Sequence, residues 1–243
     1  MKLGKRGKAA GRGLTAAIAR VYLPCFLSMF VVFQPLFAQT NLSNPDGSRM
    51  SGLQSYRTGR DMEGRDRIDE ATLYYNQAIQ ICLDEISGNT ATQDTYAVFT
   101  WTLQRQKRYA DVITWGERAL QLYPTDYRII ETMGEAYFYL NEYDRSLVFM
   151  QRYVNFLPQG DRSSVAYFFI GEIFRLQGRY LHADIAYTTA VQLEPRISLW
   201  WYRLGTVREA LEDLSAAIQA YEQALRLNPS YQEAQDGLAR SRR

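Results

Sequence analysis

Histidine and cysteine are scarce in this chain of 243 residues, and their scarcity excludes most of the common enzyme mechanisms. His182 is the only histidine, and Cys25 and Cys82 are the only cysteines. So few of these residues cannot supply a Ser/His/Asp triad, a Cys/His pair or a zinc site. His182 is interpreted as structural and Cys82 as a small buried hydrophobe. The sequence therefore predicts no catalytic residue, no metal site and no cofactor, and an enzyme with an unrecognised site is the weaker alternative.

A hydrophobic run long enough to cross a membrane with ease is also missing. The apolar run at residues 21–37 contains Pro24, Gln34 and Pro35 and is marginal for a spanning helix. It follows a basic stretch and ends at Ala38, an order typical of a secretory signal peptide. We predict a signal peptide at residues 1–38, with an uncleaved signal anchor as the alternative. Both interpretations export the rest of the chain, most simply to a bacterial periplasm.

The basic residues are unevenly distributed. The formal charge is +2, but six of the 28 basic residues and none of the 26 acidic ones precede residue 39. That leaves 22 basic against 26 acidic residues, a net charge of −4, in the remainder of the chain. An acidic balance argues against a nucleic-acid partner. Contact with a membrane is predicted only through an uncleaved leader.

What the chain does contain is a repeat with a period of 34 residues. Residues 164–197 and 198–231 align without a gap, and the same kinds of residue recur at the same places. The order is aromatic, aliphatic, glycine, then alanine, aromatic, alanine, proline. This order resembles the tetratricopeptide repeat, or TPR. The matched pairs are Tyr167 and Trp201, Ile170 and Leu204, Gly171 and Gly205, Ala183 and Ala217, Tyr187 and Tyr221, Ala190 and Ala224, and Pro195 and Pro229.

The resemblance implies an all-α solenoid of helical hairpins, with about five units and a C-terminal capping helix. The first unit fits the pattern worst, and a single capping helix over residues 68–86 is its alternative. A flexible linker is predicted at residues 39–51, before the array at 52–243. The predicted units are 52–92, 93–126, 127–163, 164–197 and 198–231, with the cap at 232–243.

Glycines recur inside the first helix of the better units, although a glycine in mid-helix costs about 1 kcal/mol relative to alanine. Each falls opposite a small residue of the second helix, so we expect the two helices to approach closely there. The pairs are Gly134 with Ser146, Gly171 with Ala183, and Gly205 with Ala217.

In TPR proteins the first helices line a concave groove, and the resemblance implies that a protein or peptide ligand binds in it. The Lys/Asn clamp of the chaperone-tail class is missing from the matching positions. Aromatic and arginine side chains are enriched at binding hot spots; the alternative is that the aromatic ones pack between repeats. The predicted groove residues are Trp101, Arg105, Arg128, Glu131, Glu135, Phe138, Phe168, Glu172, Arg175, Tyr202, Arg203 and Glu209.

The predicted function is an exported, non-enzymatic scaffold or adaptor that takes part in envelope assembly or maintenance. One alternative is a membrane-anchored adaptor of a multiprotein complex. A weaker one is a solute-binding accessory to a transporter.

Overall fold

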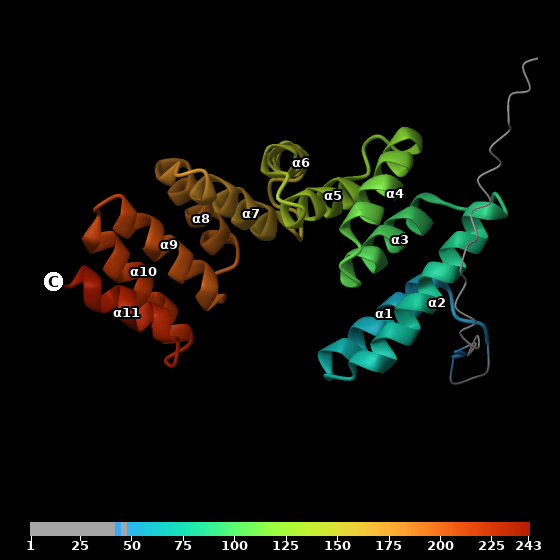
Figure 1. Cartoon of the computed structure of the whole chain (residues 1–243), viewed down its shortest axis with the longest axis horizontal. Coiled ribbons are helices and arrows are strands. Elements are labelled where there is room, and N and C mark those ends of the chain that lie inside the picture. Colours follow the sequence, from blue (N-terminus) through green and yellow to red (C-terminus); the bar gives the residue numbers. More distant parts are fainter. Residues whose placement is uncertain (1–41, 45–47) are drawn as a thin grey trace, which may run out of the picture. The chain divides into compact units, whose positions relative to one another are not determined.

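The computed structural model describes residues 42–44 and 48–243, and the predicted leader lies outside them. The regular structure of this described part is entirely helical apart from one isolated bridge between Ser43 and Arg49 (Figure 1). This confirms the all-α helical-repeat prediction. The helices are α1 (Gly52–Gly64), α2 (Ile68–Ser87), α3 (Gln93–Arg105), α4 (Tyr109–Leu122), α5 (Tyr127–Tyr139), α6 (Tyr143–Phe156), α7 (Ser163–Leu176), α8 (Tyr180–Leu193), α9 (Ser198–Ala210), α10 (Leu214–Leu227) and α11 (Gln232–Ser241).

Consecutive helices form hairpins, and each turn within a hairpin has three residues. The middle residue of every such turn has a positive φ, from 58° to 71°. That conformation reverses the chain sharply, and glycine, asparagine and aspartate adopt it at least cost. The five residues are Asp66, Lys107, Asn141, Gly178 and Glu212.

Local sequence signals mark where the helices begin and end. Ser51 and Thr92 cap α1 and α3 with their hydroxyl groups, and both helices begin with a capping box. Asp126 accepts from the backbone N–H of Arg128 at the start of α5. A proline follows the second helix of four hairpins by two residues and prevents that helix from continuing. These prolines are Pro124, Pro158, Pro195 and Pro229.

The hairpins pack in the order of the chain, each against the next. In addition, α1 contacts α3, α3 contacts α5, and α5 contacts α7. The first helices of successive hairpins are therefore neighbours and lie on the same side of the array. The buried core runs through the array and is built from residues such as Phe99, Met133, Ile173 and Leu204.

At each of the three predicted glycine pairs, the atoms nearest to the glycine come from a larger side chain, one turn beyond the small residue of the pattern. A Cβ placed on Gly171 would lie 2.6 Å from the ring of Tyr187, and one on Gly205 would lie 2.6 Å from Tyr221. A tyrosine ring thus fills the space beside each of these two glycines. Beside Gly134 the nearest side chain is Met150, at 3.1 Å, while Ser146 Oγ donates to the Gly134 carbonyl (2.7 Å).

The segment predicted as a flexible linker packs on α2 where it is described. Met50 is buried, and Gln77 of α2 donates to the carbonyl of Leu42 (2.8 Å). Residues 52–92 hold two packed helices, where a single helix was the alternative. Within the described part of the chain, no helix combines the length and apolarity that a membrane span requires.

Candidate functional site

An open cleft of about 920 Å³ lies along the first helices of the array. Its lining comes mainly from α1, α3, α5, α7 and α9 and the turns beside them, with one tyrosine each from α4 and α6. No single repeat makes this cleft: α5 lines it along its whole length, and the other first helices contribute shorter stretches. Six of the twelve predicted groove residues line it: Trp101, Arg105, Arg128, Glu131, Glu135 and Phe168.

Two buried glutamates of α5 form the middle of the cleft. Glu131 and Glu135 are only 5% and 6% exposed. Arg162, which directly precedes α7, bonds to both carboxylates, at 2.9 Å in the case of Glu131, and Gln104 of α3 donates to Glu135. Burial, and then the neighbouring charge of Glu135, raises the pKa of Glu131 well above its ordinary range. One arginine thus serves two carboxylates, and Glu131 holds a proton more readily than an exposed glutamate does.

Aromatic pairs line the cleft on either side of these glutamates. Tyr56 of α1 contacts Trp101 of α3, with ring centroids 5.7 Å apart. Phe168 of α7 stacks on Trp200 of α9 at 5.1 Å, with 15° between the ring planes. Both pairs join neighbouring first helices and also line the cleft. For Trp101 and Phe168, packing between repeats and exposure to a ligand are therefore compatible.

Arg128 is held in place by two carboxylates. Its guanidinium bonds to Asp126 (2.9 Å) in its own turn and to Asp94 (2.6 Å) at the start of α3. Burial opposes the charged form, but the bond to Asp126 is stronger and raises the pKa of Arg128 further. This arginine is a fixed part of the wall.

The remaining predicted residues do not line the cleft. Glu172 accepts from the hydroxyl of Tyr187 and pairs with Arg175 (2.8 Å) and Arg203 (3.0 Å). Glu209 accepts from Tyr221 (2.6 Å). These charged groups are used inside the array, as links between a first helix and its neighbours. Phe138 packs on Phe169 at 4.9 Å, Tyr202 lies 5.0 Å from Tyr231, and Arg240 bonds to Glu209 at 2.8 Å.

The sequence reasoning missed several lining residues. It assigned no groove residue to the first hairpin, whose pattern is weak, and none to the inserted residues before α7. Stacked rings from α4 and α5, 4.7 Å apart, also went unnoticed because one of them belongs to a second helix. The missed residues include Tyr56, Arg60, Glu63, Lys107, Tyr109, Tyr139, Arg162 and Trp200.

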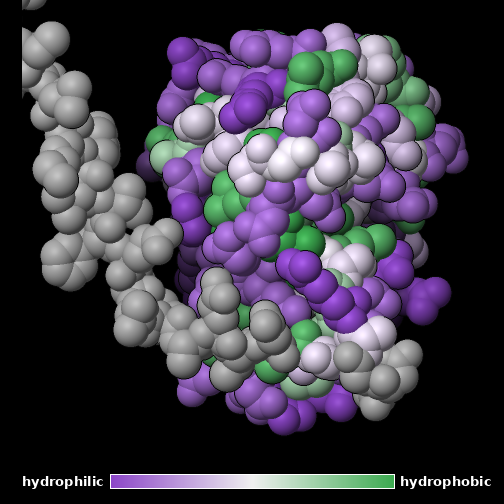
Figure 2. Space-filling view, turned by 90° about the vertical axis from the view of Figure 1, so that its right-hand side faces the viewer, coloured by the Kyte–Doolittle hydropathy of each residue, from purple (hydrophilic) through white to green (hydrophobic). Residues whose placement is uncertain are grey.

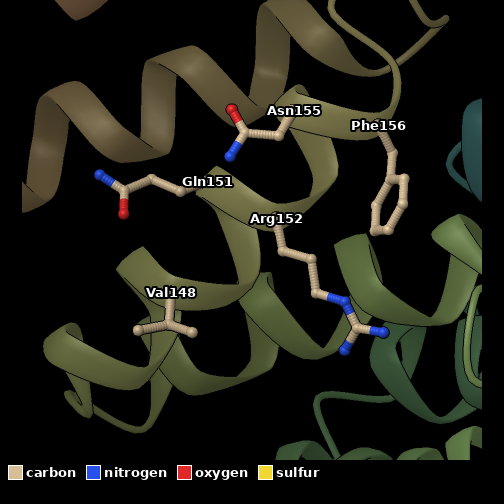
Figure 3. A pocket seen from close by; sticks show the side chains of 5 residues that line it. All are labelled: Val148, Gln151, Arg152, Asn155 and Phe156. Carbon is tan, nitrogen blue, oxygen red and sulfur yellow. The ribbon is translucent and has the colours of Figure 1, made fainter.

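A second, shallower hollow of about 440 Å³ lies on α6. Figure 3 shows that all five of its labelled side chains come from this one helix. Val148 and Phe156 are 61% and 53% exposed there. This surface has no carboxylate and no contribution from a first helix, so it offers a useful comparison for the cleft.

Cys82 and His182, which are the types of residue that act as nucleophile and base, have ordinary structural surroundings. Burial raises the pKa of Cys82 to about 12, so its thiol is protonated at neutral pH. His182 is exposed and packs against the ring of Phe174 at 5.2 Å. Among residues 42–44 and 48–243, no three His, Cys, Asp or Glu side chains are grouped to hold a metal ion.

Two stretches of the chain match family models. Residues 164–197 and 198–231 each match a model described as a tetratricopeptide repeat. Residues 164–231 are thus similar to two consecutive TPR units. They contribute α7 to α10, including Phe168 and Trp200 of the cleft. A comparison with characterised protein sequences found no match.

Solved structures, two of which are described as TPR proteins, resemble most of this chain. MamA 41-end from Desulfovibrio magneticus RS-1 is 15% identical, with a TM-score of 0.59 over 74% of this chain and 96% of that one. A thermophilic TPR protein from Thermus thermophilus is also 15% identical, with a TM-score of 0.58 over 79% and 98%. YrrB, a TPR protein with an unusual peptide-binding site, is 14% identical, with a TM-score of 0.53 over 76% and 91%. At these identities the likeness establishes the TPR-type fold.

Proposed function

We propose that this protein is a non-enzymatic interaction scaffold whose cleft binds a segment of a partner protein. The observation that carries the proposal is the composition of the cleft, which combines aromatic pairs with arginines and carboxylates from five successive first helices. These residue types anchor protein interfaces. A volume of about 920 Å³ is at the upper end of the range for a bound ligand, and suits a few side chains of an extended segment.

The relation to other TPR proteins supports a peptide ligand. YrrB is described by its peptide-binding site, and the array here has the same type of fold. A scaffold needs a preformed surface more than a reactive group. The fixed pairs around Arg128 and Arg162 supply such a surface, because groups already held in place lose little freedom on binding.

Location is a second part of the proposal. A basic stretch, an apolar run and Ala38 favour a secretory signal, so we propose an exported scaffold that serves envelope assembly or maintenance in a bacterial periplasm. Mass spectrometry of the purified protein tests this. A chain that begins at Gln39 supports cleavage, an intact leader in the membrane supports the anchored adaptor, and an intact chain in the cytoplasm refutes export.

Peptide display tests the binding site. We would select peptides on the wild-type protein and measure their affinity for two variants that each lose two apolar side chains. Trp101→Ala/Phe168→Ala removes two rings from the cleft, and Val148→Ala/Phe156→Ala removes two side chains from the α6 hollow. The cleft variant should weaken binding by about tenfold or more, the scale of a hot spot, while the α6 variant keeps it.

The two rings also pack between helices, so a second readout uses the wild-type protein. A selected peptide carrying a photoreactive group should crosslink to first-helix residues of the cleft. Crosslinks on α6, or equal affinity losses in both variants, would refute the cleft as the binding site.

A further inference from the structure

The end of the cleft formed by α1 and α3 carries exposed cations beside an aromatic pair. Arg60 follows Tyr56 by four residues in α1, and Arg105 follows Trp101 by four residues in α3. Residues four apart lie on the same face of a helix, one turn above each other. Since the Tyr56 and Trp101 rings touch, the two arginines that accompany them line the same end of the cleft. Lys107, two residues after Arg105, lines it as well.

The described part of the chain neutralises these cations only in part. Glu63 is the carboxylate of this end, and it is shared between Arg105 (3.7 Å) and the hydroxyl of Tyr75 (2.6 Å). Arg60 and Lys107 are exposed, and neither makes an ion pair or side-chain hydrogen bond with the described residues. Three cations against one carboxylate leave an excess of positive charge. The middle of the cleft differs, because its glutamates are already bonded.

Lys107 occupies a backbone position that lysine adopts at a cost. Its φ is 58°, in the left-handed region, which costs a residue with a Cβ about 1–2 kcal/mol. Equivalent turns use Asp66, Asn141 and Gly178, which tolerate this region, and Glu212 is the other exception. Among the described residues Lys107 is unpaired, and it is the only lysine after residue 8. A lysine at this strained position is consistent with a role for its charge.

The combination of an aromatic residue with a cation four residues later does not recur in the first helices of the next two units. The position of Trp101 in α3 corresponds to Glu135 in α5 and to Glu172 in α7. Both of these are carboxylates with internal partners. The excess of cations is thus confined to the α1–α3 end and is not a general property of the repeat.

We infer that the α1–α3 end of the cleft recognises an acidic segment of a partner protein. Its carboxylates lie against Arg60, Arg105 and Lys107, while an aromatic or apolar side chain packs on Tyr56 and Trp101. This inference rests on the proposed function and gives the partner a chemistry. Nucleic acid is disfavoured, because the chain carries −4 from residue 39 onward and a polyanion needs a longer track of cations.

Fluorescence anisotropy with two labelled peptides of equal length tests the inference. One peptide repeats Glu-Phe-Asp and the other repeats Lys-Phe-Arg, and each is measured against the full-length protein. The test variant is Arg60→Glu/Lys107→Glu. The control is Arg57→Glu/Arg196→Glu, which changes net charge equally at exposed arginines outside the cleft. None of the four side chains makes an ion pair with the described residues, so folding should be preserved in both variants.

The acidic peptide should bind wild type more tightly than the basic one does. The test variant should lose about tenfold or more in affinity for it and gain affinity for the basic peptide, while the control loses little. Raising the salt from about 0.1 M to about 1 M, which shortens the Debye length from about 10 Å to about 3 Å, should weaken the acidic complex.

Preference for the basic peptide, failure of the acidic one to bind, or equal losses in test and control would each overturn the inference. Tighter binding of single-stranded DNA or of anionic lipid vesicles, lost in the same test variant, would overturn the choice of a protein segment. The proposed function survives these results if displayed peptides still crosslink to the cleft. If no displayed peptide binds there at all, the proposed function fails as well.

Discussion

Replacement of Gly171 by alanine isolates one packing contact of the array. A methyl group at this position would lie 2.6, 2.7 and 3.0 Å from three ring carbons of Tyr187. That ring is fully buried, its hydroxyl donates to Glu172, and Phe168 lies 5.7 Å from its centre. The tyrosine cannot move aside without breaking these contacts. The helices must therefore separate, or the ring must leave its rotamer.

Two effects of opposite sign determine how much Gly171→Ala changes the free energy of unfolding. Alanine is favoured over glycine inside a helix by about 1 kcal/mol, and overpacking of a filled core costs about 1–3 kcal/mol. Three contacts at or below 3.0 Å to a ring that is fixed at both ends place this site at the upper part of that range. We expect Gly171→Ala to lower the free energy of unfolding by about 1–2 kcal/mol, measured by urea denaturation with circular dichroism.

Gly64 is the matched control, because it ends α1 and a Cβ there would meet nothing within 4 Å. Gly64→Ala should be neutral or stabilising by up to about 1 kcal/mol. A double-mutant cycle with Tyr187→Leu, which removes the ring, should show that the two losses at 171 and 187 are less than additive by about 1 kcal/mol or more. Additive losses, or a stabilising Gly171→Ala, would refute the explanation of this glycine.

Three further outcomes are expected. Glu131→Gln should stabilise the protein at neutral pH, because burial raises the pKa of Glu131 in the folded state. The favourable contribution of Glu131 to stability is present below its unfolded pKa of about 4.3 and is lost as pH rises through the folded value. Urea titrations from pH 4 to 8 should therefore show that the stability advantage of the variant grows with pH, and a constant advantage would contradict this. Lys107→Gly should raise the free energy of unfolding by about 0.5–1 kcal/mol by relieving the positive φ, while it weakens acidic-peptide binding; a destabilised variant would show that the lysine is not strained. Amide exchange should be faster at residues 52–89 than at 164–231, because α1 is packed against helices on one side only; uniform protection would contradict a graded array.

The fold could be predicted from the sequence because its signals are local and repeated. The order of glycine, alanine, aromatic and proline between residues 164 and 231 matches two family models, and the turns and prolines continue that spacing through the earlier units. The contacts between side chains, in contrast, are not determined by the local sequence. The pattern pairs Gly171 with Ala183, but the side chain that reaches Gly171 comes from Tyr187, one turn further along α8.

The cleft was only half predictable for a related reason. Trp101 and Glu135 occupy groove positions that the repeat spacing identifies. Arg162 lies among inserted residues with no counterpart in the repeat, and Arg60 belongs to a hairpin whose pattern is weak. Glu172 occupies a groove position yet is bonded internally, because a neighbouring arginine can satisfy a carboxylate before a ligand does. The side-chain positions of several helices must be known together to distinguish a residue that lines the cleft from one that is bonded internally.

Selection of a partner must depend on positions that the repeat leaves free. Core positions must fill the space between helices, so in the last two units they recur as glycine, alanine and tyrosine, and substitutions there cost packing energy. One groove position instead runs through Arg60, Trp101, Glu135, Glu172 and Thr206 from α1 to α9. A partner segment that lies in the cleft along α1, α3 and α5 meets a cation first, then an aromatic ring, then the paired carboxylate of Glu135. Because this order is not symmetric, the cleft can distinguish the two directions of a bound chain, with the acidic end of the segment over α1 and α3. On the face drawn in Figure 2, hydrophobic areas are small and lie among hydrophilic ones. Single anchors in a polar surround, as at Trp101 beside Arg105, are the usual arrangement of a specific, reversible protein interface.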